Sequence, residues 1–207
     1  MAKLDTYVED LTSSLGVLTS TSTGAGTFSI VSSALNVYSG AASDVGRGGL
    51  ELAYGADIDE SSAYFEVVSI PTGGRCDISC DDASENGYRI RLTSTQITIS
   101  GLVGGFPTTL YGPVSWSSAS HKWIRFREAS GTTYIEGAPD SGSGAPGTWS
   151  TLASEATTTT GWTHTAVRIQ WVMPNGAGNG TSRYRYLNTN APVVGGRPNA
   201  FMLLGVR

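Results

Sequence analysis

Charge, cysteine, histidine and long apolar runs are all scarce in this sequence. Only 14% of the 207 residues are charged, and there are two cysteines and two histidines. A chain of this size with two cysteines does not depend on a disulfide scaffold. The net charge of −4 argues against a nucleic-acid partner, because phosphate binding needs a concentrated positive surface. No segment approaches the roughly 20 apolar residues that span a bilayer, so we expect no membrane insertion.

The N-terminal segment lacks the apolar core of a secretory signal, because its first residues are acidic and polar. We therefore expect no signal peptide and synthesis in a cytoplasm. Residues 1–20 are expected to form an arm or a first strand. Residues 21–207 are expected to form a single domain, since a chain of this length suits one β-sandwich.

Glycine-rich turns and short alternating runs dominate the rest of the sequence. The chain has 27 glycines, and the stretch from Lys122 to Ser154 contains three alternating runs separated by turns near Gly131 and Pro139. In the first run, Ile124 and Phe126 point to one side. Period-two alternation between turns predicts antiparallel strands. About a dozen such runs predict an all-β fold, an antiparallel two-sheet β-sandwich or jelly roll.

The order of the runs gives the expected elements. Leu4 to Val17 is read as a weak helix or a first strand. The expected strands are Thr27 to Ser32, Ala34 to Ser39, Gly48 to Tyr54, Ala63 to Ile70, Gly87 to Thr95, Gln96 to Leu102, Phe106 to Leu110, Trp123 to Glu128, Thr133 to Glu136, Trp149 to Leu152, Thr163 to Met173, Ser182 to Leu187 and Ala200 to Val206.

Arginines recur on the polar side of three of these runs. If the three strands are neighbours, their polar side chains form one stripe, which is a candidate binding surface. The stripe consists of Arg89, Arg91, Arg125, Arg127, Arg168 and Gln170. A guanidinium group presents a planar fork of donors that suits carboxylates and sugar hydroxyls. The alternative is a solvated outer sheet face on which the arginines pair with Glu66, Glu128 and Glu136.

Three segments resemble concanavalin A-like (laminin G-like) jelly rolls. They are GTFSIVSSALNVYSG, the pair AYFEVVSIP and SENGYRIRLTSTQITISG, and HKWIRFREASGTTYIEGAPDSGSGAPGTWSTLAS. The resemblance implies the sandwich fold for most of the chain. Such domains recur in bacteriophage tail and virion proteins, in carbohydrate-binding proteins and in glycosidases. Fold alone does not choose among these uses.

The chain departs from the catalytic pattern of that family. The glucanases it resembles carry paired carboxylates at alternate positions of one strand. The densest acidic group here, from Asp57 to Glu60, is expected to be a loop that does not hold its carboxylates at the spacing glycosidic cleavage needs. We therefore assign no catalytic residues.

Metal and thiol sites are also not indicated. Asp77, Asp81 and Asp82, or Asp57 and Asp59, offer oxygens for calcium, but their spacing matches no calcium loop, so no metal or cofactor is expected. Cys76 and Cys80 stand about 13 Å apart on an extended strand, too far for a disulfide. A tight turn would bring them together, and two small buried residues is the other interpretation.

Aromatic residues and histidines complete the set of candidates. Trp116 lies in a loop-like context and is a candidate sugar-stacking platform, whereas Trp171 lies on an apolar strand face and is expected in the core. His121 and His164 are read as surface residues at strand ends, since no Ser or Cys forms a nucleophile motif with them.

These observations favour a non-enzymatic structural protein of a bacteriophage virion, either a minor tail protein or a capsid decoration. We expect it to contact other virion proteins, to form a homo-oligomer and to contact a host-surface glycan. The alternative function is a lectin-like carbohydrate-binding module. An endoglycosidase ranks third because the carboxylate pair is missing.

Overall fold

The structure is a computed structural model that describes residues 1–50, 55–175 and 180–189. The expected strand from Ala200 to Val206, and the end of the one from Gly48 to Tyr54, lie outside these residues. Among the described residues, no helix is long and apolar enough to cross a membrane.

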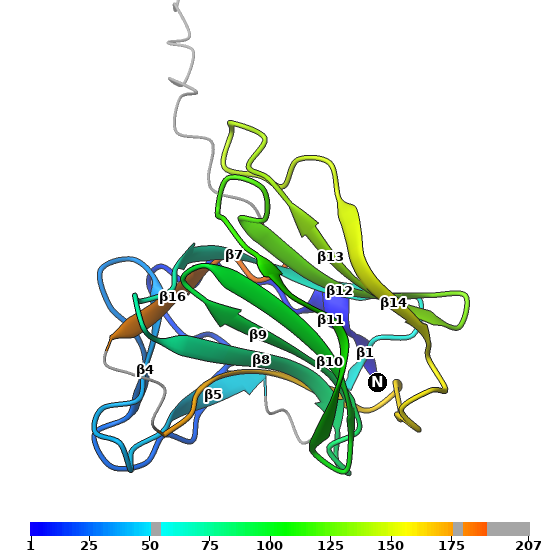
Figure 1. Cartoon of the computed structure of the whole chain (residues 1–207), viewed down its shortest axis with the longest axis horizontal. Coiled ribbons are helices and arrows are strands. Elements are labelled where there is room, and N and C mark those ends of the chain that lie inside the picture. Colours follow the sequence, from blue (N-terminus) through cyan, green and yellow to red (C-terminus); the bar gives the residue numbers. More distant parts are fainter. Residues whose placement is uncertain (51–54, 176–179, 190–207) are drawn as a thin grey trace, which may run out of the picture.

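Two β-sheets stack face to face (Figure 1). The first sheet contains β1 (Ala2–Lys3), β2 (Thr19–Ser20), β5 (Gly46–Leu50), β6 (Ala56–Asp57), β8 (Arg75–Asp82), β9 (Gly87–Thr93), β10 (Gln96–Val103), β11 (Phe106–Ser115) and β15 (Val167–Met173). Its main order is β1-β6-β15-β8-β9-β10-β11, and β5 joins β15 to β2.

The second sheet contains β3 (Thr27–Ile30), β4 (Leu35–Tyr38), β7 (Ser62–Ser69), β12 (Trp123–Ala129), β13 (Thr132–Ala138), β14 (Ser150–Ala156) and β16 (Thr181–Arg185), in the order β14-β13-β12-β7-β16-β4-β3. The strand pairs are antiparallel, apart from the short parallel pair β1–β6. The predicted antiparallel two-sheet sandwich is confirmed.

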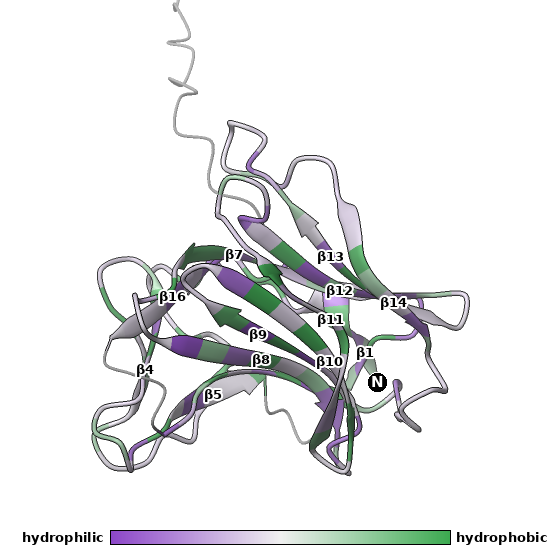
Figure 2. Ribbon diagram, viewed as in Figure 1, coloured by the Kyte–Doolittle hydropathy of each residue, from purple (hydrophilic) through white to green (hydrophobic). Residues whose placement is uncertain are grey.

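The core lies between the sheets because each central strand alternates apolar and polar residues, as Figure 2 shows for β8, β9 and β10. Trp171 on β15 is fully buried, and its ring meets that of Phe65 on β7 edge-on, with centroids 5.3 Å apart. Tyr184 on β16 packs against the same two rings. The prediction that Trp171 belongs to the core is confirmed.

Two local predictions need correction. The segment Leu4 to Val17 contains only a single 3-10 turn, η1 (Leu4–Thr6), followed by irregular chain. Its Leu4 and Leu11 side chains are fully buried, so this segment contributes to the core. β8, a central strand of the first sheet, was not among the strands predicted above, although Cys76 and Cys80 were considered on an extended strand. The division between residues 1–20 and 21–207 stays a prediction.

Candidate functional site

The six residues of the predicted stripe lie on two opposite outer faces. β9 and β15 belong to the first sheet, and β12 belongs to the second. Arg89, Arg91, Arg168 and Gln170 therefore point out of the first sheet, whereas Arg125 and Arg127 point out of the second. A single stripe is not formed. Alternation gives the face of each strand correctly, but it does not tell which sheet the strand joins.

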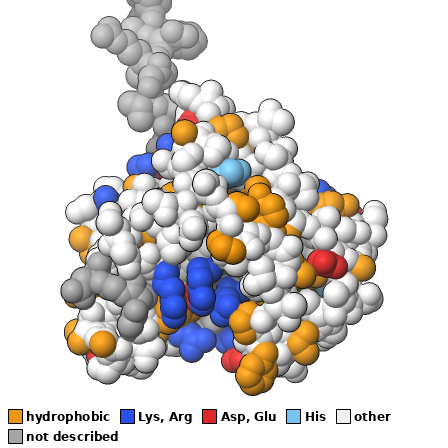
Figure 3. Space-filling view, viewed as in Figure 1, with side chains coloured by type: hydrophobic (Ala, Val, Ile, Leu, Met, Phe, Trp, Pro, Cys, Tyr) orange, Lys and Arg blue, Asp and Glu red, His pale blue; other side chains and the backbone are white. Residues whose placement is uncertain are grey.

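The outer face of the first sheet carries a shallow hollow with a volume of about 150 Å³. Figure 3 shows Lys and Arg side chains gathered there, over the strands labelled β8 and β9 in Figure 1. We call it the arginine hollow. It is lined by Arg47, Asp77, Ser79, Asp81, Glu85, Arg89, Leu102, Gly105, Arg168, Gln170 and Val172.

Strand β8, which the sequence prediction did not include, runs through the middle of this hollow. Its Cys76, Ile78 and Cys80 side chains are fully buried, so Asp77 and Asp81 point outward with Ser79 between them. Ser79 stands between Arg89 of β9 and Gln170 of β15 in the register of the sheet. β8 thus places two carboxylates between strands that carry arginines.

Each of these two carboxylates is bound by an arginine of a neighbouring strand. Arg91 donates two hydrogen bonds to Asp77, from Nε at 2.7 Å and from Nη2 at 2.8 Å. Arg168 donates from Nε to Asp81 at 2.6 Å. Arg89 lies farther from Asp77, at 3.8 Å. The hollow is therefore an arrangement of fixed charges on rigid strands.

Asp81 differs from an ordinary surface carboxylate. It is 4% exposed, and burial raises its pKa in spite of the opposing charge of Arg168; the charge of Glu85 raises this pKa further. Glu85 itself is exposed, and its carboxylate is 4.0 Å from Nη2 of Arg168. Because both carboxyl groups contact the Arg168 guanidinium group, their nearest oxygens are at most about 9 Å apart, which does not exceed the upper limit of the separations that glycoside cleavage uses.

The backbone fixes Glu85 at the rim of the hollow. Its φ of +58° is uncommon for a residue with a side chain. Its carbonyl accepts a 2.9 Å hydrogen bond from Gly105 N, which ties the β8–β9 turn to the β10–β11 turn. Gly105 has a φ of +79°, which favours glycine, and a Cβ there would lie 2.3 Å from the Glu85 carboxylate and displace it. Nothing in the sequence pattern singles out Glu85, since its position depends on two turns meeting.

The outer face of the second sheet is more internally paired. Arg125 and Arg127 share Glu136, with nitrogen–oxygen distances of 2.6 and 3.1 Å. Their guanidinium groups also lie over the rings of Trp149 and Tyr134. The sequence analysis offered the alternative that the arginines pair with acidic residues on an outer sheet face. Arg125 and Arg127 do so with one of the three acids named there, Glu136.

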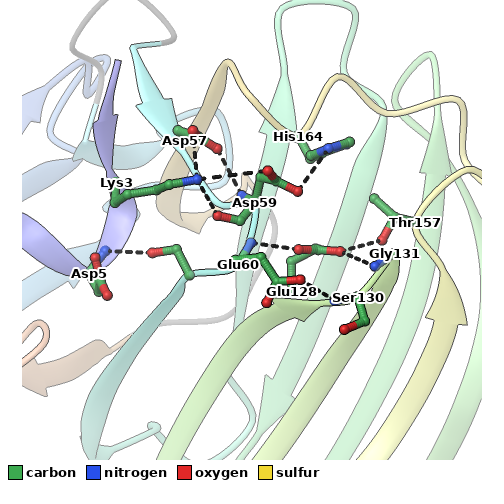
Figure 4. Close-up of polar contacts among 11 residues, drawn as sticks. Lys3, Asp5, Asp57, Asp59, Glu60, Glu128, Ser130, Gly131, Thr157 and His164 are labelled. Atoms are coloured by element: carbon green, nitrogen blue, oxygen red, sulfur yellow. Dashed lines mark hydrogen bonds and ion pairs between the residues drawn. The ribbon is translucent and has the colours of Figure 1, made fainter.

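The acidic segment from Asp57 to Glu60 lies at another edge of the sandwich (Figure 4). Lys3 forms an ion pair with Asp57 at 2.9 Å and donates to the Asp59 carbonyl. The Glu60 carboxylate accepts a hydrogen bond from the backbone N–H of Ser130. These acids order loops, and the segment, expected to be a loop, is the end of the short strand β6 followed by a turn.

The remaining sequence candidates are structural. Trp116, expected as an exposed sugar platform, is buried, and its Nε1 donates to the His121 carbonyl at 3.2 Å. Cys76 and Cys80 are free and buried, and burial raises the pKa of Cys76 to about 12. No group of three His, Cys, Asp or Glu side chains within the described ranges is placed to hold a metal ion.

The fold resembles solved structures of carbohydrate-active proteins. The apo transglycosylase Crh5 superposes with a TM-score of 0.62 at 11% identity, over 93% of this chain and 88% of that one. Crh5 in complex with NAG gives a TM-score of 0.61 at 12% identity, over 90% and 84%. The GH43 protein BlXynB (K247S mutant) from Bacillus licheniformis gives 0.50 at 11% identity, over 87% of this chain and 38% of that one.

A protein of unknown function from Shewanella oneidensis MR-1 matches with a TM-score of 0.53 at 14% identity, over 87% of this chain and 83% of that one. No protein-family model matches the chain, and no curated protein does.

These neighbours correct the prediction of a non-enzymatic protein, because the sandwich they share with this chain is that of a transglycosylase and of a GH43 protein. At such low identity the likeness establishes the fold alone. The β-sandwich implied by the concanavalin A-like (laminin G-like) resemblance is confirmed, and none of the neighbours named above is described as a laminin G-like or bacteriophage protein.

Proposed function

We propose that the protein is a carbohydrate-active enzyme that binds a saccharide in the arginine hollow and cleaves or transfers a glycosidic bond there. The observation that carries this proposal is the pair of unlike carboxyl groups at one guanidinium group. Asp81 is buried with a raised pKa, and Glu85 is exposed at the rim. Two carboxyl groups whose environments differ in this way suit an acid and a base.

The roles follow from burial. Asp81, which holds its proton to higher pH than a free aspartate, gives that proton to the glycosidic oxygen as the bond to the anomeric carbon breaks. Glu85 takes the proton of the water or sugar hydroxyl that attacks the same carbon. Arg168, bound to Asp81 and next to Glu85, holds the two groups in position.

A turn beside the hollow offers an apolar surface for a sugar ring. Phe106 is 80% exposed and Val103 is 59% exposed. Phe106 directly follows Gly105, which lines the hollow, and Val103 precedes it by two residues. An exposed aromatic ring next to polar donors is a common arrangement in ligand sites. Phe106 takes the role that the sequence had suggested for Trp116.

Incubation of the protein with a panel of oligosaccharides tests this function, with products detected by mass spectrometry. We expect shortened or extended oligosaccharides. Glu85→Gln and Asp81→Asn should each lower the rate by about 100-fold or more, the usual contribution of a positioned acid or base.

Glu60→Gln is the matched control. Glu60 is also exposed, also lies in a turn, and also has a positive φ, of +48°, but it lines a different pocket, with Arg127 and Glu128. Its rate should equal that of the wild type. The absence of any product across the panel, or an equal loss in Glu60→Gln, contradicts the proposal.

Assembly into a virion, contact with other virion proteins and homo-oligomer formation stay predictions. They are compatible with the proposed activity, since a saccharide-cleaving domain at a virion surface meets the glycans of a host. Light scattering during size-exclusion chromatography measures the oligomeric state directly.

A further inference from the structure

The outer face of the first sheet has more arginines than acids to pair with them. Five arginine side chains point outward from this face, on β5, β8, β9 and β15. They are Arg47, Arg75, Arg89, Arg91 and Arg168. In the described part of these strands the acids on the same face are Asp77 and Asp81, and Glu85 adds a third at the rim. The chain as a whole has a net charge of −4, so this local excess of positive charge is unusual for it.

The excess is concentrated around Arg89. Burial lowers the pKa of Arg89, and the charges of Arg91 and Arg75 lower it further, against the opposing effect of Asp77. Because an arginine stays protonated in proteins, the repulsion among these three guanidinium groups persists in the free protein. A bound anion would relieve it.

Several donors of this group are unsatisfied. The Nε atoms of Arg47, Arg75 and Arg89 are buried and have no hydrogen-bond partner among the described residues. In contrast, Arg91 and Arg168 use their Nε atoms on Asp77 and Asp81. A buried donor without a partner costs stability, so the acceptors of the described residues do not saturate these three guanidinium groups.

We propose that the arginine hollow is specific for an acidic saccharide. Arg89 and Arg47, which line the hollow, bind a carboxylate or sulfate group of the substrate, and Arg75, whose charge acts on Arg89 from outside the lining, strengthens the attraction. The inference rests on the proposed function and narrows its substrate class. Guanidinium groups bind such planar or tetrahedral oxyanions through paired N–H donors. The described residues that line the hollow include no aromatic side chain, so polar recognition dominates inside it.

The register of the sheet places this anion site next to the reacting groups. Arg89 stands opposite Ser79, and Ser79 is two residues from Asp81 along β8. Two residues of a strand span about 7 Å, which is close to the length of one sugar unit. The acidic group therefore belongs to the sugar next to the bond that breaks.

Binding to three glucans with the same backbone tests the proposal. Carboxymethylcellulose, cellulose sulfate and uncharged hydroxyethylcellulose differ in charge and in the kind of oxyanion, so the first two also separate carboxylate from sulfate recognition. Isothermal titration should give at least tenfold tighter binding to one of the charged glucans than to the uncharged one. Inorganic polyphosphate, an anion without sugars, should bind more weakly than that glucan.

Arg89→Gln should weaken binding of the charged glucan at least tenfold. Arg127→Gln, which removes an arginine of comparable exposure from the opposite face, is the matched control and should bind like the wild type. Arg75→Gln provides a second variant in case Arg89→Gln does not fold, which thermal unfolding will show. Equal affinity for charged and uncharged glucans, or an equal loss in Arg127→Gln, overturns the inference.

The two proposals fail separately. If neutral saccharides are cleaved as well as charged ones and cleavage depends on Glu85, the enzyme function is supported and the specificity for acidic saccharides is overturned. Charged glucans that bind through Arg89 but give no product keep the anion site and overturn the catalytic function. Polyphosphate that binds as tightly as the charged glucan overturns saccharide specificity.

Discussion

The two outer faces of the sandwich have similar arginine patterns and use them differently. On the second sheet, Arg125 and Arg127 bind a common Glu136 and stack on aromatic rings. On the first sheet, five arginines share fewer acids, and the Nε atoms of three of them are buried without a partner among the described residues, against one such arginine, Arg183, on the second sheet.

The difference lies in where the acids and aromatic rings stand. In the second sheet, β13 places Glu136 opposite Arg125, and β7 places Tyr64 on its other side. In the first sheet, the residue opposite Arg89 is Ser79, which brings no charge. The cross-strand neighbour therefore decides the role of an arginine on a strand. Opposite an acid it forms an ion pair within the protein, and opposite an uncharged residue it can bind a ligand. The first face is built to accept an anion and the second to be stable without one.

Removal of an acid from the second face should have the largest effect on stability. Glu66 is 1% exposed and accepts two hydrogen bonds from Arg185, at 2.8 and 3.0 Å, while Lys122 lies 3.0 Å away. Glu66→Ala leaves two cations without their shared partner, and we expect a loss of about 3 kcal/mol in the free energy of unfolding. Urea denaturation measures this loss of unfolding free energy. The affinity of Glu66→Ala for the charged glucan should equal that of the wild type.

Asp59→Ala is the control for that loss. Asp59 is about half exposed, with its side chain at 46% of full exposure, and an exposed ion pair contributes less than about 1 kcal/mol. If Glu66→Ala costs no more than Asp59→Ala, the second face is not stabilised by its internal pairing.

Removal of an acid from the first face should have a smaller effect on stability and the opposite effect on binding. Asp77→Asn removes the carboxylate that Arg91 binds with two hydrogen bonds and that Arg89 approaches. We expect a loss of about 1 to 2 kcal/mol in unfolding free energy and several-fold tighter binding of a charged glucan. Weaker binding would show that Asp77 itself contacts the saccharide.

The fold was predictable where apolar residues alternate strictly. β9, β12 and β15 were predicted with the correct core residues because Ile90, Phe126, Trp171 and their neighbours repeat every second position. β8 was missed because aspartate, serine and cysteine are weak indicators of a strand. The alternation of Cys76, Ile78 and Cys80 with polar residues was the available signal.

The candidate site was predictable only in part. Arg89, Arg168 and Gln170 were identified and line the hollow. Arg91, also identified, does not line it and binds Asp77, which does. Their separation from Arg125 and Arg127 depends on sheet order, which is set by long-range pairing and leaves no local pattern. Glu85 depends on two turns meeting in space, and so no motif indicates it.

The smallest expected effects concern pH, and they should have opposite signs on the two faces. Burial raises the pKa of Asp81 on the first face. A hydrogen bond from Lys122 lowers the pKa of Asp140 beside the second face. A raised carboxyl pKa gives stability that is present below the unfolded-state value, near pH 4, and is lost as pH rises through the raised value. A lowered pKa gives stability that is present above that value and is lost as pH falls.

Urea denaturation between about pH 3.5 and 7 compares wild type, Asp81→Asn and Asp140→Asn, which isolates each group from the other titrating acids. The stability lost in Asp140→Asn should grow as pH rises, and that lost in Asp81→Asn should shrink. If the stability lost in both variants changes with pH in the same direction, the ion pair with Arg168 outweighs the effect of burial on Asp81. Asp81 would then be ionised at neutral pH, and the general acid of the proposed reaction would have to be a different group.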